Sequence, residues 1–168
     1  MQIIKCTKKL QKEMGLTKSK LSNNDPSDSL LGPWHANLIH IYGKKCVVFV
    51  NDKTLFNFII PDITRDHIRS LSGMFSTYLS CTLADEGIDE LFRERILDEH
   101  SVIEYKNTDN KSVIGSMNDI ALHYTIKIEH EGSLHSTEIP NIIKKLNRMP
   151  MTAIKSVFPI KALYESLL

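Results

Sequence analysis

A carboxylate and an imidazole stand at helical spacing in the second half of this chain. Asp119 and His123 are four residues apart in a stretch with a period near 3.6, so their side chains can meet on one face. Such a pair can fix a histidine tautomer or offer two ligands to one metal ion. The same spacing also fits a solvated helix face with an incidental Asp–His contact.

His35 and Asn37 form a second polar pair, on an expected strand. They are two residues apart and therefore share a face with Ile39 and Ile41. A buried imidazole or amide without hydrogen-bond partners costs ~1–3 kcal/mol. Either nearby backbone groups or the polar groups of a functional site would supply those partners. His35 is also the donor that we expect to complete a metal site with Asp119 and His123, because two ligands alone do not hold an ion.

Other polar residues stand at expected turns and helix ends. Turn chemistry explains Asn51 and Asp52 without any function, and a cation at a helix end explains Arg148. The sequence assigns no catalytic residue, cofactor or metal ion. The predicted pocket residues are Trp34, His35, Asn37, Asn51, Asp52, Ser116, Asn118, Asp119, His123 and Arg148.

Hydrophobic patterning predicts the elements that must position these residues. Apolar residues on both parities of the strands indicate a sheet that is covered on both faces. The predicted fold class is α+β, with an antiparallel β-meander of about 4–5 strands covered by about five α-helices, in a single domain over 1–168. A flexible loop is expected at 22–30. The main strands are expected at 34–42, 45–51 and 54–60, and the longer helices at 64–87 and 111–132.

Composition narrows the function classes. The net charge of +1 does not indicate a polyelectrolyte partner, although six lysines stand in the first twenty residues. Three scattered cysteines do not form a disulfide framework or a thiolate zinc site. The N-terminus lacks a signal-peptide pattern, and "CVVFV" is far shorter than the ~20 residues that span a bilayer. These features predict a cytoplasmic protein without a membrane partner.

The stretches "WHANL", "VNDKTLF", "GSMND" and "LNRMPM", in this order, resemble a bacterial family of uncharacterised domains of unknown function. The resemblance covers nearly the whole chain and implies no activity, ligand or partner. Lys111 stands where arginine is a frequent alternative, which disfavours a role that needs a guanidinium fork. Besides the pocket residues above, the resemblance adds the polar motif positions Lys53, Asn147 and Pro150.

Three functions are compatible with these features. The first is a ligand-binding or interaction module with a polar pocket between the 34–60 meander and the 111–130 helix. The second is a hydrolase or transferase, with or without a metal, in which His35 or His123 is the base and Asp119 its orienting partner. The third is a mobile-element accessory that binds nucleic acid through the N-terminal lysines. A small ligand or a protein is the expected partner, ahead of nucleic acid.

Overall fold

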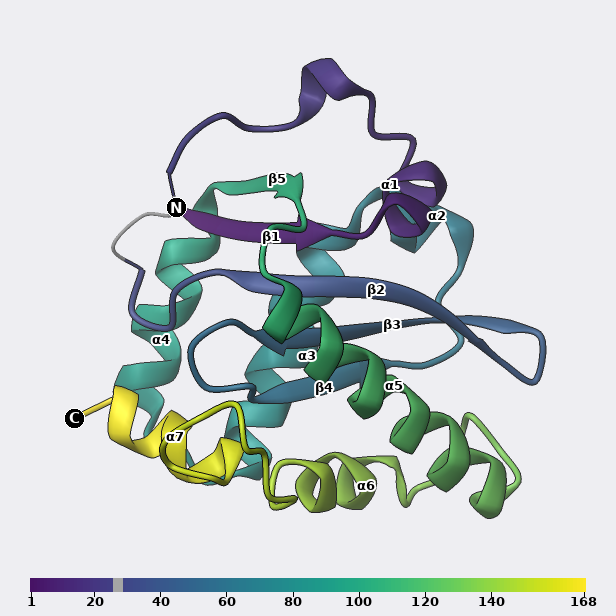
Figure 1. The fold of residues 1–168 in the computed structure, drawn as a ribbon, viewed down its shortest axis with the longest axis vertical. Helices are drawn as coiled ribbons and strands as arrows, with labels where there is room; N and C mark the ends of the chain where they lie inside the picture. Colours follow the sequence, from purple (N-terminus) through teal and green to yellow (C-terminus); the bar gives the residue numbers. More distant parts are fainter. Residues whose placement is uncertain (26–28) are drawn as a thin grey trace.

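The protein is built around one five-stranded sheet (Figure 1). The structure is a computed structural model, and it describes residues 1–25 and 29–168. Across the sheet the strand order is β4-β3-β2-β1-β5. The strands are β1 (Gln2–Cys6), β2 (Trp34–Ile41), β3 (Lys44–Asn51), β4 (Asn57–Ile60) and β5 (Ile103–Asn107).

Strands β2, β3 and β4 form the predicted antiparallel meander. The β2–β3 hairpin closes through Tyr42 and Gly43, whose φ angles of 51° and 70° suit the two-residue turn that follows the natural twist of the strands. Strand β4 begins at Asn57, three residues later than expected, because residues 51–55 form a turn in which Leu55 has a φ of 57°.

The prediction of a purely antiparallel sheet is wrong, because the sheet is mixed. Strand β1 pairs in parallel with both β2 and β5. Parallel neighbours need a long crossover, and residues 7–33 supply one between β1 and β2, with α1 (Lys8–Met14) and η1 (Lys18–Lys20) in it. Residues 61–102, with three helices, separate β4 from β5.

The described residues contain seven α-helices, where about five were predicted. The stretch 64–87, expected as one helix, is interrupted at Ser70, whose φ of −113° and ψ of 45° are not helical. The predicted helix over 111–132 is confirmed, with Gly132 as its left-handed cap. Besides α1, the helices are α2 (Arg65–Arg69), α3 (Leu71–Asp85), α4 (Glu90–Asp98), α5 (Lys111–Glu131), α6 (Ile139–Leu146) and α7 (Pro159–Ser166); η2 spans Glu99–Ser101.

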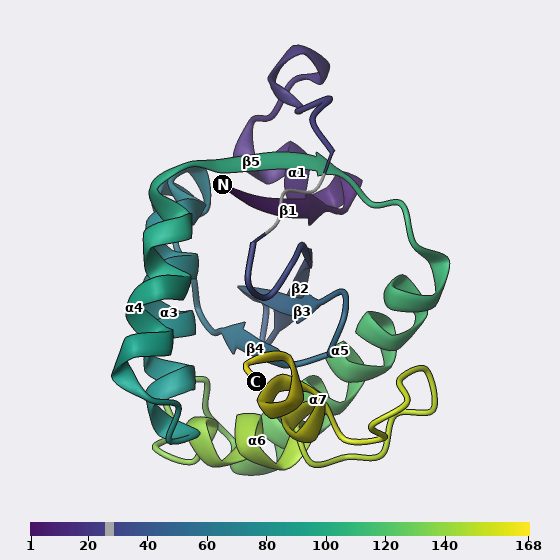
Figure 2. The same ribbon diagram turned by 90° about the vertical axis from the view of Figure 1, so that its left-hand side faces the viewer.

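Helices cover both faces of the sheet, as the strand patterns predicted (Figure 2). Helices α3 and α4 lie on one side, α5 lies on the other, and α6 and α7 lie beyond the β4 edge. On the α3 side, Trp34 packs edge-on against Phe58 and Phe75, with ring centroids 5.7 and 5.6 Å apart. Aromatic pairs of this kind contribute beyond simple burial.

Side-chain hydrogen bonds attach α5 and the end of α6 to β4. The Tyr124 hydroxyl of α5 donates to Asn57 Oδ1 over 2.7 Å. The Asn147 amide exchanges two hydrogen bonds with the Asn57 backbone, of 2.8 and 2.9 Å. Because all three residues are buried, each bond satisfies a group that would otherwise lose its contact with water.

The expected flexible loop at 22–30 includes residues 26–28, which lie outside the described residues. Other residues of this loop, on both sides of 26–28, make specific contacts. Ser22 and Asn24 both bond the Glu104 carboxylate of β5, and the Leu30 amide donates to the Glu99 carboxylate.

Candidate functional site

A row of facing residues crosses the whole sheet and carries most of its buried polar side chains. Strand pairing aligns Lys106, Lys5, His35, Val50 and Asn57 from β5 to β4. Residues aligned in this way point to the same face of a sheet. The bond from Tyr124 to Asn57 shows that this face is the one covered by α5.

Near the middle of this row, four charged or titratable side chains meet. The Lys5 ammonium donates to Asp52 Oδ2 over 2.8 Å and to Asp109 Oδ1 over 2.9 Å. His35 Nδ1 donates to Asp52 Oδ1 over 2.6 Å. Lys5, His35, Asp52 and Asp109 are called the ionic cluster below. They come from four separate segments: β1, β2, the turn after β3, and the loop before α5.

One nitrogen of the ionic cluster has no hydrogen-bond partner. His35 is fully buried, and its Nε2 lies 3.9 Å from Asp109 Oδ1, too far for a hydrogen bond. Because a carboxylate only accepts, the hydrogen on Nδ1 belongs to the bond with Asp52. In the neutral imidazole, Nε2 therefore presents a free lone pair toward the Asp109 carboxylate.

The turn after β3 positions Asp52. Asn51 is buried, and its side chain donates to the Leu31 carbonyl and accepts from the Lys53 and Thr54 amides. The Asp52 amide donates to the Pro33 carbonyl just before β2. These bonds hold the Asp52 carboxylate against the beginning of β2, where His35 is the second residue.

The start of α5 positions Asp109. Asn110 caps this helix, and its side chain accepts from the Ser112 and Val113 amides. Asp109 directly precedes this cap, where the positive end of the helix dipole favours a carboxylate. Its side chain is 52% exposed, whereas the Asp52 side chain is 11% exposed, so Asp109 forms the solvent side of the ionic cluster.

Two carboxylates and one ammonium leave the ionic cluster with an excess of negative charge when His35 is neutral. Burial disfavours the charged form of Lys5, but the hydrogen bonds to Asp52 and Asp109 outweigh this effect and raise the pKa of Lys5. Lys5 is therefore a firmly protonated ammonium, and the remaining charge attracts a further cation.

His35, Asp52 and Asp109 fit a metal ion as a donor set. Each offers one ligand atom, and these three atoms lie within 4.8 Å of one another. Imidazole with carboxylates suits divalent transition metals.

A polar cavity of about 400 Å³ adjoins the ionic cluster, and Asp109 is part of its wall. Its lining carries charges of both signs, because Lys18 and Lys106 stand in the same wall as Asp109. The Lys106 ammonium also donates to the Asn24 carbonyl over 2.7 Å. The remaining lining is Leu21, Ser22, Asn23, Asn107 and Thr108.

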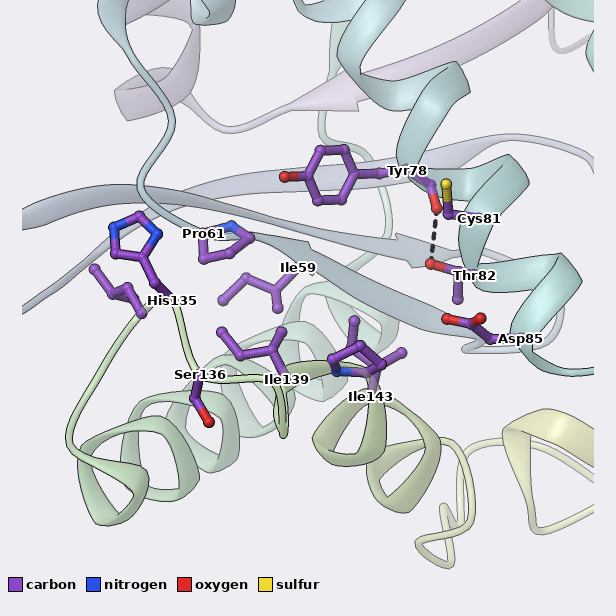
Figure 3. A pocket seen from close by; sticks show the side chains of 12 residues that line it. Ile59, Pro61, Tyr78, Cys81, Thr82, Asp85, His135, Ser136, Ile139 and Ile143 are labelled. Atoms are coloured by element: carbon purple, nitrogen blue, oxygen red, sulfur yellow. Dashed lines mark hydrogen bonds between the residues drawn. The ribbon is translucent and has the colours of Figure 1, made fainter.

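A second cavity, of about 320 Å³, lies between β4, α3 and α6 (Figure 3). Its walls are largely apolar, with Ile59, Ile139 and Ile143 among the lining side chains. The Thr82 hydroxyl in this wall is satisfied by the Tyr78 carbonyl at 2.8 Å. No unpartnered buried polar atom of the described residues belongs to this cavity, so it offers less chemistry than the ionic cluster. Neither cavity lies between the meander and α5.

Five of the predicted pocket residues come from β2, the last position of β3 and the turn after it. The structure brings His35 and Asp52 together, while Trp34 points to the aromatic α3 side. Asn37 accepts a hydrogen bond from the Thr7 hydroxyl over 2.9 Å. Turn chemistry explains Asn51, as predicted, but it does not explain Asp52, whose carboxylate binds Lys5 and His35.

The other five lie on α5 and after α6. Asn118 and Asp119 are exposed, while Ser116 and His123 are half-buried. Among the described contacts, no hydrogen bond joins Asp119 to His123 or either of them to His35. Arg148 forms two hydrogen bonds to the buried Glu86 carboxylate, of 3.1 and 2.8 Å.

The sequence analysis missed Lys5 and Asp109. Lys5 is a lone charge inside the apolar strand "QIIKC", and a buried lysine requires an acidic partner. That signal was available, although it does not say which acid is the partner. Asp109 lies in "NTDN", which turn and cap chemistry explains fully.

Among the described residues, no helix is both long enough and apolar enough to cross a membrane.

Comparison with known proteins assigns the chain to a family. Neither the curated proteins nor the solved structures include a match to the chain. A family model, described as Domain of unknown function (DUF6933), matches residues 3–162. The resemblance to an uncharacterised family is thereby confirmed, and the chain belongs to the DUF6933 family.

Proposed function

We propose that this domain is a binding module for a small polar ligand, with its site at the ionic cluster and the adjoining polar cavity. The observation that carries the proposal is His35 Nε2, a fully buried nitrogen without a partner, beside a half-exposed carboxylate. Buried polar atoms in proteins are normally satisfied, and an exception calls for an explanation such as a bound water, an ion or a catalytic role.

The charges of the cavity indicate the class of ligand. Asp109 favours a cationic group, while Lys18 and Lys106, which also line the cavity, favour an anionic group. A volume of about 400 Å³ suits a small molecule. We therefore propose a zwitterionic ligand of the size of an amino acid, with its amine toward Asp109 and its acid toward the lysines.

Thermal unfolding in the presence of individual free amino acids, with EDTA in the buffer, tests this function. We expect at least one amino acid to raise the Tm, because a ligand at 100 times its Kd adds about 2.7 kcal/mol of stability. Lys18→Glu should abolish that rise, since it reverses a charge of the cavity wall.

Lys12→Glu is the matched control, because Lys12 is also exposed but lies on α1 outside the cavity. The control should keep the ligand-induced rise in Tm. The proposal fails if no amino acid shifts the Tm, or if Lys18→Glu and Lys12→Glu respond alike.

The predicted pocket between the meander and α5 remains a separate proposal for Asn37, Ser116, Asn118, Asp119 and His123. If it binds the ligand, Asp119→Asn should also remove the rise in Tm. A site at the ionic cluster alone predicts no effect of this substitution.

A hydrolase or transferase is the second candidate, with or without a bound metal. The predicted residues were His35, Asp119 and His123, and the observation that favours catalysis is the His35–Asp52 pair. A carboxylate that orients an imidazole is the arrangement of a general base. Water would have to be the nucleophile, because no described hydroxyl or thiol bonds His35 Nε2. This candidate is disfavoured if the purified protein hydrolyses neither p-nitrophenyl acetate nor p-nitrophenyl phosphate.

Nucleic-acid binding by a mobile-element accessory rests on the N-terminal lysines alone. Lys5 is occupied within the ionic cluster, and Lys8 donates to Asn107 over 2.9 Å. Lys12, Lys18 and Lys20 are exposed. Failure to bind DNA or RNA at low salt would remove this hypothesis, because phosphate contacts are strongest there.

A further inference from the structure

We infer that the ionic cluster binds a divalent transition-metal ion, with His35 Nε2 and the Asp109 carboxylate as its principal ligands and Asp52 as the third donor of the set. The inference deepens the proposed function, on which it rests, by placing an ion at the buried end of the same site. Two independent observations support it: the three donor atoms within 4.8 Å, and the unpartnered, fully buried Nε2 that lies 3.9 Å from Asp109 Oδ1.

The hydrogen bonds of His35 prepare it as a ligand. Metal-binding histidines donate their second ring nitrogen to a carboxylate or carbonyl, which fixes the tautomer and makes the free nitrogen more basic. His35 Nδ1 makes such a bond to Asp52 over 2.6 Å. Nε2 and Asp109 Oδ1 are 3.9 Å apart, so an ion between them could lie about 2.1 Å from each.

The remaining coordination positions face outward. Asp109 is half-exposed and belongs to the wall of the polar cavity, so water or a ligand group can approach the ion from there. Imidazole nitrogen with carboxylate oxygen favours Mn²⁺, Fe²⁺, Co²⁺ or Zn²⁺, whereas Ca²⁺ and Mg²⁺ prefer oxygen ligands alone.

Lys5 is the competitor of this ion. Its ammonium bridges the same two carboxylates at 2.8 and 2.9 Å and partly neutralises them. A divalent ion and an ammonium in one small site repel each other, so binding has to displace or weaken the Lys5 contacts. This competition gives the inference a directional test: removing the Lys5 charge should tighten metal binding.

Titration of the purified protein with Co²⁺, followed by visible absorbance and by calorimetry, provides that test. We expect one ion per chain in the wild type. Asp109→Asn should weaken Co²⁺ binding at least about tenfold, and Lys5→Met should tighten it at least about tenfold. Asp62→Asn is the matched control, because Asp62 pairs with the exposed His135 at the surface, and it should leave Co²⁺ binding unchanged.

The outcomes separate the alternatives. No Co²⁺ binding by the wild type overturns the inference, and binding only by Lys5→Met identifies Lys5 as the resident cation of the native protein. Loss of binding in Asp62→Asn but not in Asp109→Asn assigns the ion to the surface pair and also overturns it. If Lys5→Met does not fold, the comparison of Asp109→Asn with Asp62→Asn still decides. The amino-acid test above is done in EDTA, which removes divalent metal ions, so its result does not depend on metal binding. Failure of the Co²⁺ titration therefore does not affect the amino-acid test, and failure of the amino-acid test does not affect the Co²⁺ titration.

Discussion

At the scale of single residues, Asp52 bonds two other members of the ionic cluster at once. One carboxylate oxygen accepts from His35 of β2, and the other accepts from Lys5 of β1. Asp52 itself follows β3. A single side chain therefore joins three segments, and it does so in a nearly dry environment, where each bond is stronger than in water.

Replacing Asp52 with Asn should reduce the free energy of unfolding by about 2–4 kcal/mol. The amide keeps the shape of the carboxylate but removes the more buried of the two charges that compensate the Lys5 ammonium. Urea denaturation monitored by circular dichroism measures this loss.

Asp62→Asn again supplies the control for this stability measurement. Asp62 also bonds a histidine at 2.8 Å, but the His135 side chain is 76% exposed. Surface ion pairs contribute about 1 kcal/mol or less. Equal losses in the two variants would mean that Asp52 acts only as a surface pair and does not hold the ionic cluster together.

Asn51 and Asp52 show what the sequence can say about a residue. Both types are frequent at turns, and the Asn51 side-chain oxygen makes the expected turn bonds to Lys53 and Thr54. Asp52 satisfies the same local pattern, yet its carboxylate faces Lys5, 47 positions away in the chain. Local propensity gives the backbone conformation of a residue and leaves its distant partner undetermined.

At the scale of elements, α5 links the ionic cluster to the core. Its first turn follows Asp109 directly, and Met117, Ile120, Tyr124 and Ile128 are buried on its inner face. The cap at Asn110 therefore affects both the helix and the position of Asp109.

Asn110→Ala should lower the free energy of unfolding by about 1 kcal/mol, because it leaves the Ser112 and Val113 amides without their side-chain acceptor. Asn118→Ala, at an exposed position within the same helix, should be neutral or slightly stabilising, since alanine has the higher helix propensity. Urea denaturation of both variants measures the difference. Equal effects of the two substitutions would show that the cap does not stabilise α5.

The elements themselves were largely predictable, but their pairing was not. The hairpin at Gly43 and the end of α5 at Gly132 follow from turn and cap chemistry in the sequence. The parallel pairing of β1 with β2 and β5 does not, because a buried strand has the same apolar pattern in parallel and antiparallel sheets. The break at Ser70 was also missed, because the apolar period continues through it from Ile68 to Leu71.

At the scale of the whole molecule, the candidate site is a product of topology. Lys5, His35, Asp52 and Asp109 are spread over two thirds of the chain, and only the strand order and register bring them together. The sequence predicts a site between β2 and α5 that includes His35, a residue that needs hydrogen-bond partners when it is buried. Lys5 could not be predicted as the neighbour of His35. The two residues are adjacent only because β1 pairs with β2, and this pairing depends on a crossover of 27 residues, at 7–33.

The same topology brings the beginning of the chain near His100. Burial of His100, with a further contribution from the N-terminal ammonium, lowers its pKa to about 4. Its Nδ1 bonds the Ser76 hydroxyl at 3.0 Å, and its Nε2 is buried without a partner. Because the pKa in the folded state lies below that of the unfolded chain, about 6.5, the unfolded state binds more protons between these values.

The free energy of unfolding should therefore fall as the pH decreases from 6.5 toward 4, with His100 accounting for about 2 kcal/mol of the loss between pH 7 and pH 4.5. His100→Gln retains a partner for Ser76 but does not titrate, so its stability should decline less over this range. Urea denaturation of both proteins at the two pH values gives the difference directly, with pH 7 as the internal reference for any loss unrelated to protonation. Parallel pH profiles for the wild type and His100→Gln would contradict the burial of a neutral imidazole at this position.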